Sequence, residues 1–288
     1  MPELPEVETI KNGLKIRILN KKIKKIWIED SFQKRIFPSK GKFLDLVRNK
    51  LFQNIERRGK LLIFSITKDL FVLVHLKMTG QLVYKSKEKI ISGGHPMKNI
   101  DHLPNRFTRV IFYFSDGKQL FFNDLRKFGY LKLVNKIELE EILGLYGFEP
   151  LGKSFTYARF DKLLKKKARL RVKPWLLDQR QIAGLGNIYS DEACFLARIL
   201  PDRLAGSLNE TEARALYKAI KIVLKKGIKF KGTSFNTYVN SEGEGGGFQK
   251  MLNVYGRKKL HCRRCRKGII ENKKLGGRTT AYCPICQK

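Results

Sequence analysis

This chain of 288 residues is poor in negative charge and has no long apolar runs. Only 26 acidic residues oppose 60 Lys and Arg, and the formal net charge of +34 excludes an ordinary balanced surface. A polyanion is the natural partner for such an excess. No apolar run approaches the roughly 18–20 residues of a membrane span, and the acidic, proline-containing start is unlike a signal peptide. We therefore expect a protein of the cytoplasm or nucleoid with no membrane partner.

Cysteine is also scarce, and four of the five cysteines stand in two pairs. Cys262-x-x-Cys265 and Cys283-x-x-Cys286 are separated by seventeen residues. The two-residue spacing lets a tight turn present both thiolates to one ion, and two such turns complete a tetrahedron around Zn²⁺. Disulfide pairing is the alternative, which a reducing cytosol disfavours. We expect one structural zinc ion, because no ligand position stays open, and a core position for Cys194.

The start of the chain combines a helix signal with a candidate nucleophile. Apolar residues recur at helical spacing over Val7–Leu14, and Pro5 suits a first helical turn, so a helix is predicted to begin near Pro5. If Met1 is removed, Pro2 carries a secondary amine. Free α-amines titrate near about 7.7–8.0, so a fraction is neutral at cellular pH and can attack carbon. Such an amine forms an iminium with an aldehyde, which promotes elimination. The alternative is a helix start and nothing more.

The pattern of apolar residues divides the chain. Strands are predicted at Ile23–Ile28, Leu61–Ile66, Leu70–Leu76, Val110–Phe114 and Leu120–Phe122, with a hairpin turn at 115–118. Helices are predicted at 160–164, 175–195 and 211–226, the last with a capping box over 207–210 and Gly227 at its end. We expect a sheet domain at 1–134, a linker at 135–152, a helical domain at 153–250 and a metal module at 251–288.

Seven motifs, in order, resemble those of one family. They are Pro2–Glu8, Arg57–Lys60, His75–Gly80, Asp124–Gly129, Leu177–Gln179, Gly184–Tyr189 and the four-cysteine motif. Over essentially its whole length the chain resembles the formamidopyrimidine-DNA glycosylases, bacterial base-excision enzymes for oxidised purines. The resemblance implies an α+β multidomain fold: an N-terminal β-sandwich with an N-terminal helix, a helical helix-two-turns-helix domain and a C-terminal zinc finger. It implies a monomer that binds damaged double-stranded DNA in the cleft between the domains, in the bacterial nucleoid.

The resemblance also implies catalytic roles. Pro2 attacks the sugar, expels the oxidised base and forms a Schiff base. Glu3 is the expected proton carrier for sugar-ring opening. Lys60 resembles the lysine that aids β-elimination, and Arg278 the finger arginine linked to δ-elimination and phosphate contact. The simpler interpretation of Lys60 is one more exposed lysine.

Other residues are expected to occupy the space that a flipped-out nucleotide leaves in the duplex. By resemblance these are Met78, Arg126 and Phe128: a thioether, a planar cation and an aromatic wedge. Without the resemblance, Met78 and Phe128 are more often core residues. The glycine-rich segment Ser241–Gly247 corresponds to the family's mobile segment over the lesion base.

Contacts to the DNA backbone are expected from three further residues. Asn187 follows Gly-x-Gly at the approach to a helix, where amides can hold a phosphate. Arg169 and Lys173 belong to a basic run, part of which is alternatively plain solvated surface. Where the family usually has a His-x-His pair, this chain has Phe107-Thr108-Arg109, and we expect Arg109 to take over a phosphate contact.

Two alternatives remain beside the oxidised-purine glycosylase and lyase. One is the sister enzyme endonuclease VIII, which takes oxidised pyrimidines; Leu4 favours the purine branch. The other is a non-catalytic DNA-binding protein, against which Pro2, Glu3 and Lys60 argue. An insertion over 85–104 is longer than expected for the family.

Overall fold

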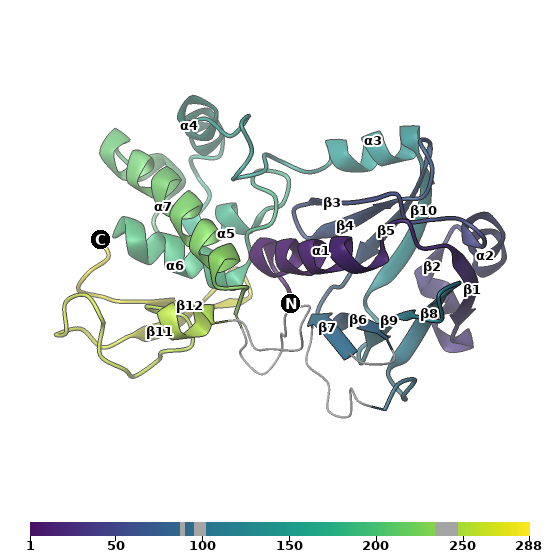
Figure 1. Ribbon diagram of the computed structural model, residues 1–288. Helices are drawn as coiled ribbons and strands as arrows, with labels where there is room; N and C mark the ends of the chain where they lie inside the picture. Colours follow the sequence, from purple (N-terminus) through teal and green to yellow (C-terminus); the bar gives the residue numbers. More distant parts are fainter. Residues whose placement is uncertain (87–89, 95–101, 234–246) are drawn as a thin grey trace. The chain divides into compact units, whose positions relative to one another are not determined.

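The computed structural model describes residues 1–86, 90–94, 102–233 and 247–288 (Figure 1). The chain splits into two compact units, which we call unit 1 and unit 2. Unit 1 is Met1–Gly144 with Phe230–Gln249, and unit 2 is Leu145–Lys229 with Lys250–Lys288. Among the described residues, no helix is both long and apolar enough to cross a membrane.

The described part of unit 1 is a sandwich of two five-stranded sheets (Figure 1). One sheet has the order β1 (Ile23–Ile28), β8 (Thr108–Phe114), β9 (Gln119–Asp124), β6 (Gly80–Lys85) and β7 (Ile90–Gly94). The other has the order β2 (Ile36–Phe37), β10 (Tyr130–Asn135), β5 (Leu70–His75), β4 (Leu61–Ser65) and β3 (Asn54–Arg58). Neighbouring strands pair antiparallel except β2 with β10. All five predicted strand segments are confirmed.

Alternation of side chains explains why these strands form a sandwich. Every second residue of a strand points to the same face, and that face is apolar on both sheets. The shared core includes Leu62, Phe64, Val72, Val74, Leu82, Val110, Phe112, Phe114, Leu120, Phe122, Leu131 and Leu133. The predicted hairpin at 115–118 is confirmed, with Gly117 at a φ of +79° between β8 and β9.

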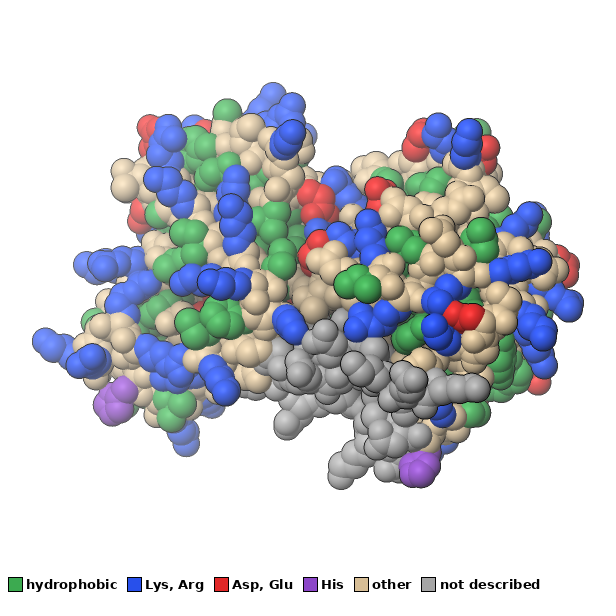
Figure 2. Space-filling model, viewed as in Figure 1, with side chains coloured by type: hydrophobic (Ala, Val, Ile, Leu, Met, Phe, Trp, Pro, Cys, Tyr) green, Lys and Arg blue, Asp and Glu red, His purple; other side chains and the backbone are tan. Residues whose placement is uncertain are grey.

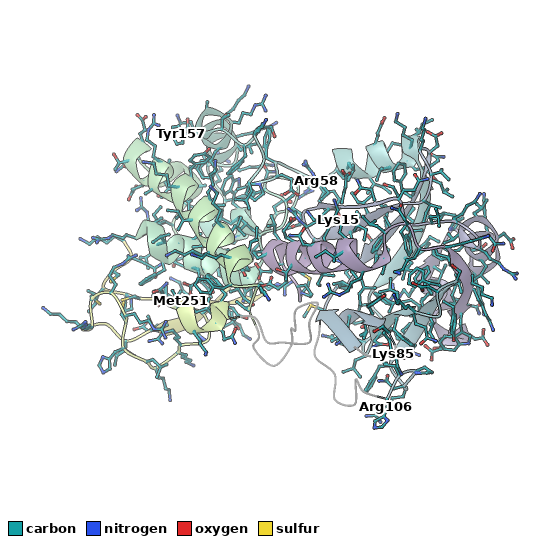
Figure 3. The ribbon with its side chains drawn as sticks, in the orientation of Figure 1. Lys15, Arg58, Lys85, Arg106, Tyr157 and Met251 are labelled. Carbon is teal, nitrogen blue, oxygen red and sulfur yellow. The ribbon has the colours of Figure 1, made fainter. Side chains whose placement is uncertain are left out.

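Helix α1 (Leu4–Ile18) begins where Pro5 predicts it. Glu3 caps it: its backbone N–H donates to Glu6 Oε2 at 2.9 Å, and its carboxylate accepts the Glu6 N–H. The helix packs against β3, β4 and β6, and Lys15 and Arg58 mark α1 and the end of β3 in Figure 3. The shorter helices of unit 1 are η1 (Asp30–Arg35), α2 (Lys40–Val47) and α3 (Lys136–Gly144). Helix α3 lies within the stretch 135–152 and covers β5 and β10.

Unit 2 is helical, with a small hairpin. Its elements are α4 (Tyr157–Lys166), α5 (Val172–Leu177), α6 (Asn187–Ala197), η2 (Ala205–Ser207), α7 (Glu210–Lys229), β11 (Glu271–Leu275) and β12 (Arg278–Tyr282), and η3 (Phe248–Met251) spans the boundary between the units. The prediction of one helix over 175–195 is wrong, because turns at 178–186 separate α5 from α6. The Gln179 amide donates to the carbonyls of Leu177 and Leu185 and accepts the Gly184 N–H, which closes these turns.

Two details of α7 also differ from the prediction. The capping box is formed by Asn209 and Glu212, each of whose side chains accepts the other's backbone N–H, and not by residues 207–210. Gly227 does not end the helix, which continues to Lys229. A Cβ at Gly227 would lie 2.6 Å from the Tyr189 hydroxyl, so glycine there permits close packing of α6 on α7.

Candidate functional site

The start of α1 is held by one carboxylate. Glu6 Oε2 accepts the Glu3 N–H, while Glu6 Oε1 accepts the Thr233 N–H at 2.9 Å and its hydroxyl at 3.2 Å. Glu6 is 2% exposed, and Glu3 and Pro2 are also buried. Hydrogen bonds to a buried charged group are stronger than those between neutral groups. Glu6 thus joins Pro2-Glu3 to residue 233, a contact that no local pattern signals because the partners lie 227 positions apart.

The turn between β3 and β4 carries Lys60, which is only 6% exposed. It is therefore not one more exposed lysine. The Arg57 guanidinium donates to the Gly59 carbonyl at 3.0 Å and to Glu8 Oε2 at 2.9 Å. Glu8 also binds Lys11 at 2.5 Å. Burial raises the pKa of Glu8, but the hydrogen bonds and the positive charges of Lys11 and Arg57 together outweigh it and lower that pKa overall. The ionised Glu8 thus fastens the Lys60 turn to the first turns of α1.

His75 lies beside this turn and carries no charge. It pairs with Leu61 across β4 and β5, and its Nδ1 accepts the Lys77 N–H at 3.0 Å. Burial and the nearby charges of Lys77 and Lys60 lower the pKa of His75 to about 3. It therefore acts as a neutral acceptor that shapes the turn after β5.

Met78 and Arg126 lie on two turns joined by Asp124. The Asp124 carboxylate accepts the Thr79 hydroxyl, the Arg126 N–H at 3.2 Å and the Gly129 N–H at 2.7 Å. The Arg126 N–H also donates to the Thr79 hydroxyl at 3.0 Å. One buried carboxylate thus holds the turn before β6 against the turn after β9, and the structure brings together the two segments expected to enter the duplex.

The residues of the second turn point outward. Phe128 is 42% exposed, Arg126 is exposed, and the Arg126 guanidinium lies 4.6 Å from the centre of the Phe128 ring. A core position for Phe128 is therefore wrong, whereas Met78 is half-buried. A planar cation stacked on an exposed ring offers a flat surface that a base can stack on. We call residues 125–128 the stacking turn.

Arg109 is not available to a phosphate. It is 4% exposed; its guanidinium binds Glu29 Oε2 at 2.6 Å and donates to the Asp124 carbonyl at 2.9 Å. The expectation of a DNA contact from Arg109 is therefore corrected. The Phe107-Thr108-Arg109 sequence could not reveal this, because both partners are distant in the chain.

Lys173 is likewise used internally. It and Asp191 are fully buried, with Nζ 2.6 Å from Asp191 Oδ1 and 3.0 Å from the Thr279 carbonyl. Asp191 Oδ2 accepts the Ala281 N–H at 3.0 Å, and Asn187 Nδ2 donates to the Thr279 carbonyl at 3.0 Å. Lys173 thus joins α5 and α6 to β12, and the expected phosphate contact from it is also corrected.

Of the remaining predicted contacts of unit 2, Arg278 and Arg169 are exposed and Asn187 is half-buried. Arg278 is exposed at the end of the two-residue turn Gly276-Gly277, whose φ values of +55° and +71° suit a tight hairpin. Arg169 is exposed between α4 and α5. Asn187 is half-buried at the N-terminus of α6, and within the described residues its Oδ1 has no hydrogen-bond partner.

The four paired cysteines form a candidate metal centre in unit 2. Their Sγ atoms lie within 4.8 Å of one another, with Cys262 to Cys286 at 3.7 Å and Cys265 to Cys283 at 3.8 Å. Four thiolates around one tetrahedral Zn²⁺ would lie about 3.8 Å apart. Backbone N–H groups point at three of the sulfurs, and a Cβ at Gly268 would come within 2.7 Å of Cys283 Sγ. The cluster can hold a metal ion, and the predicted core position of Cys194 is confirmed.

Positive charge extends over both units. Figure 2 shows Lys and Arg side chains spread over the visible face, with few acidic side chains between them. Residues 241–246 of the expected mobile segment, and residues 87–89 and 95–101 of the insertion over 85–104, lie outside the described residues.

Comparison with known proteins gives likenesses over the whole chain. Residues 1–131 match the family described as formamidopyrimidine-DNA glycosylase N-terminal domain, and residues 146–239 match the formamidopyrimidine-DNA glycosylase H2TH domain. The formamidopyrimidine-DNA glycosylase of Pelotomaculum thermopropionicum is 41% identical over 291 residues, covering 100% of this chain and 99% of that protein. Two solved Lactococcus lactis structures are also similar, and each comparison covers 100% of both chains. An FPG mutant with Fapy-dG containing DNA has a TM-score of 0.88 at 33% identity, and wild-type FPG with oxidised-pyrimidine containing DNA one of 0.87 at 32%.

Proposed function

Because the chain belongs to the formamidopyrimidine-DNA glycosylase family, which comprises DNA glycosylases and AP lyases of base-excision repair, we propose that it excises oxidised purines from damaged duplex DNA. The lesions are 8-oxoguanine and formamidopyrimidines. A Schiff base at Pro2 forms during excision, and the strand is then cut by β,δ-elimination. The protein acts as a monomer, with residues 1–134 as the catalytic domain.

The observation that carries this proposal is the fastening of the Lys60 turn to the start of α1 through Glu8 and Arg57. It supports an arrangement in which Pro2, Glu3 and Lys60 act on the same sugar. Met1 is 38% exposed while Pro2 is buried, so the residue to be removed is the accessible one.

The chemistry assigns one task to each group. The Pro2 nitrogen attacks C1′, and the bond from C1′ to the base breaks, with its electrons leaving on the base. Glu3 delivers a proton to O4′ as the ring opens, which leaves an iminium. Loss of a C2′ proton, aided by Lys60, then expels the 3′ phosphate. Arg278 balances charge on the phosphate during the second elimination.

We propose that the four-cysteine cluster holds one structural Zn²⁺. Its sulfur separations suit a tetrahedral ion, and backbone N–H groups pointing at sulfur stabilise thiolates. With four protein ligands the ion has no open position, so its role is to hold the hairpin that carries Arg278.

The experiment is borohydride trapping on duplex DNA containing 8-oxoguanine opposite cytosine. We expect a covalent complex with the mature protein and none with Pro2→Gly. A chain with an uncleaved extension before Met1 is the matched control, since it blocks the amine without changing any residue, and it should not trap either. Because Pro2→Gly keeps an α-amine at its terminus, trapping by this variant assigns the nucleophile to another amine only if the extended chain traps as well. A wild-type protein that binds but never traps would support a non-catalytic relative.

Oxidised pyrimidines are the second candidate substrate. The specific observation is the similar Lactococcus lactis protein in complex with DNA containing an oxidised pyrimidine. Cleavage rates on a panel of duplexes, each carrying one lesion opposite one base, distinguish oxidised purines from oxidised pyrimidines as the substrate. Faster cleavage of oxidised pyrimidines than of 8-oxoguanine would favour endonuclease VIII-like specificity.

A further inference from the structure

We propose that Arg109 is a positioning residue. Its buried guanidinium, bound to the Asp124 carbonyl and the Glu29 carboxylate, fixes the stacking turn in the position from which Arg126 and Phe128 fill the space left by a flipped-out nucleotide. The proposal rests on the proposed function in one respect, the entry of Arg126 and Phe128 into the duplex. Arg109 itself touches no DNA in this role.

The backbone of β8 aims Arg109 at this turn. The pairing register of β8 with β9 shifts between Thr108 and Val110, and such irregularities redirect a side chain. The Asp124 N–H donates to the Phe107 carbonyl at 2.9 Å, while Arg109 Nε donates to the Asp124 carbonyl at 2.9 Å. Phe107 and Arg109 therefore bind both polar backbone groups of Asp124, the residue that precedes the stacking turn.

Glu29 holds the turn from its other side. Its N–H donates to the Arg109 carbonyl at 2.9 Å and its Oε2 binds the Arg109 guanidinium at 2.6 Å. Its Oε1 lies 3.4 Å from Lys127 Nζ, which also binds the Ser31 hydroxyl. Lys127 has a φ of +53°, a strained conformation for a residue with a side chain. These bonds hold the Lys127 side chain, which is 38% exposed, against Glu29 and Ser31.

Some groups in and beside the stacking turn are bound within the protein, and others are left exposed. Asp124, Lys127 and the Arg126 N–H are all bound from behind, while the Arg126 and Phe128 side chains remain exposed. The Phe128 ring can enter the stack of DNA bases only if the backbone of the stacking turn is not displaced when it does so. The charge-assisted bond of the buried Arg109 guanidinium to Glu29, together with its bond to the Asp124 carbonyl, supplies that resistance. Displacements near 1 Å can reduce rates about a hundredfold.

The test measures insertion of the stacking turn into DNA that the protein cannot cleave. A duplex carries a tetrahydrofuran abasic analogue with 2-aminopurine beside it, so that insertion of the stacking turn changes the fluorescence. We expect Arg109→Gln to reduce this change severalfold, and Arg109→Lys, which keeps the pair with Glu29, to recover part of it. Arg35→Gln removes an exposed arginine of the same unit and should behave as wild type.

A double-mutant cycle with Phe128→Ala separates positioning from general destabilisation. On 8-oxoguanine duplexes, Arg109→Gln should lower kcat for excision about tenfold or more. In the Phe128→Ala background the same change should cost less than about threefold, because the positioned ring is gone. Trapping on single-stranded abasic DNA, where no void needs filling, should be unchanged. Additive losses, or an equal loss on single strands, would overturn the proposal.

Two further outcomes are decisive. If Arg109→Gln does not fold, Glu29→Gln, which weakens the same bond, takes its place in the cycle, and wild-type fluorescence from that variant would refute the role. If wild-type protein traps no DNA, the proposed chemistry fails, yet the fluorescence comparison among the variants still decides the positioning role.

Discussion

The stacking turn of unit 1 and the β11–β12 hairpin of unit 2 present an exposed arginine in the same way but are held differently. In each, a buried carboxylate accepts at least one backbone N–H and a cation binds a backbone carbonyl. Asp124 and Arg109 do this for Arg126, and Asp191 and Lys173 do it for Arg278. The Lys173–Asp191 pair is wholly buried, whereas Glu29, the partner of Arg109, is 27% exposed. Water therefore competes for the first assembly and not for the second.

The two turns also differ in how they accommodate residues with positive φ. The hairpin turns through Gly276 and Gly277, which accept positive φ without steric cost. The stacking turn places Lys127 at positive φ and compensates with side-chain bonds to Glu29 and Ser31. The stability of the stacking turn therefore depends on side-chain bonds that pH and mutation can weaken. The glycine hairpin depends instead on the buried Lys173–Asp191 pair that binds it.

Metal removal should produce the largest difference between the two regions. Complete chelation should unfold the hairpin, since structural zinc contributes on the order of 10 kcal/mol in isolated fingers. The stacking turn should keep its amide protection, because its partners all lie in unit 1. Hydrogen exchange of the full chain, with metal content measured in parallel, checks both. Retained protection of β11–β12 after complete metal loss would contradict the structural role.

Breaking the buried pair of unit 2 should have the next largest effect. Burial raises the pKa of Asp191 to about 7 even beside Lys173. Lys173→Met removes the opposing cation, so Asp191 must take up a proton or stay unpaired, and the free energy of unfolding should fall by about 3–5 kcal/mol. Lys173→Met with Asp191→Leu should recover most of that loss. Lys162→Met, on the exposed face of α4, is the control. Urea unfolding measures all three, and a double variant no better than the single one would argue against the pair as the cause.

Glu29→Gln should cost less, about 1 kcal/mol, because Glu29 is partly hydrated. Burial raises the pKa of Glu29, but the hydrogen bonds from Arg109 and Ser31, together with the charges of Arg109 and Lys127, outweigh it and lower that pKa overall. A depressed pKa stabilises the fold fully above the usual glutamate value of about 4.5 and less as the pH falls below it. The stability difference between wild type and Glu29→Gln should therefore shrink on acidification. Glu140→Gln, exposed on α3, should show no such convergence.

The smallest expected effect distinguishes the tasks of the two arginines. Non-specific DNA binding should weaken steeply with salt, by about 0.9 units of log K per log unit of salt for each phosphate neutralised. Arg278→Gln should reduce that slope by about one phosphate. Arg126→Gln should leave it nearly unchanged if Arg126 meets bases instead. Equal slope changes in the two variants would show that both contact the backbone.

Local patterns were enough for much of the fold and for the metal cluster. Alternating apolar residues specify strands such as Leu70–His75, and Pro5 and Gly117 mark a helix start and a hairpin turn. The Cys-x-x-Cys spacing identified four residues whose sulfurs do lie together. Each of these signals involves residues a few positions apart, or a motif complete in itself.

Local patterns failed at a glycine and at an amide side chain whose contacts the spacing of apolar residues does not describe. Gly227 looks like a helix end, but it makes room for Tyr189. The stretch 175–195 has helical periodicity, but the Gln179 side chain closes turns within it. In both places a contact outside the local pattern outweighs the local preference.

The tasks of the charged residues depended on the folded chain. Composition and motifs established a basic protein with a candidate amine nucleophile, a lysine turn and a thiolate cluster, because residue type and order carry that chemistry. They could not distinguish Arg109 and Lys173, which are buried and hold turns, from Arg126 and Arg278, which are exposed. All four are cations in basic or polar stretches. Only partners as far away as Glu29 and Thr279 determine which cation is buried and which one remains accessible.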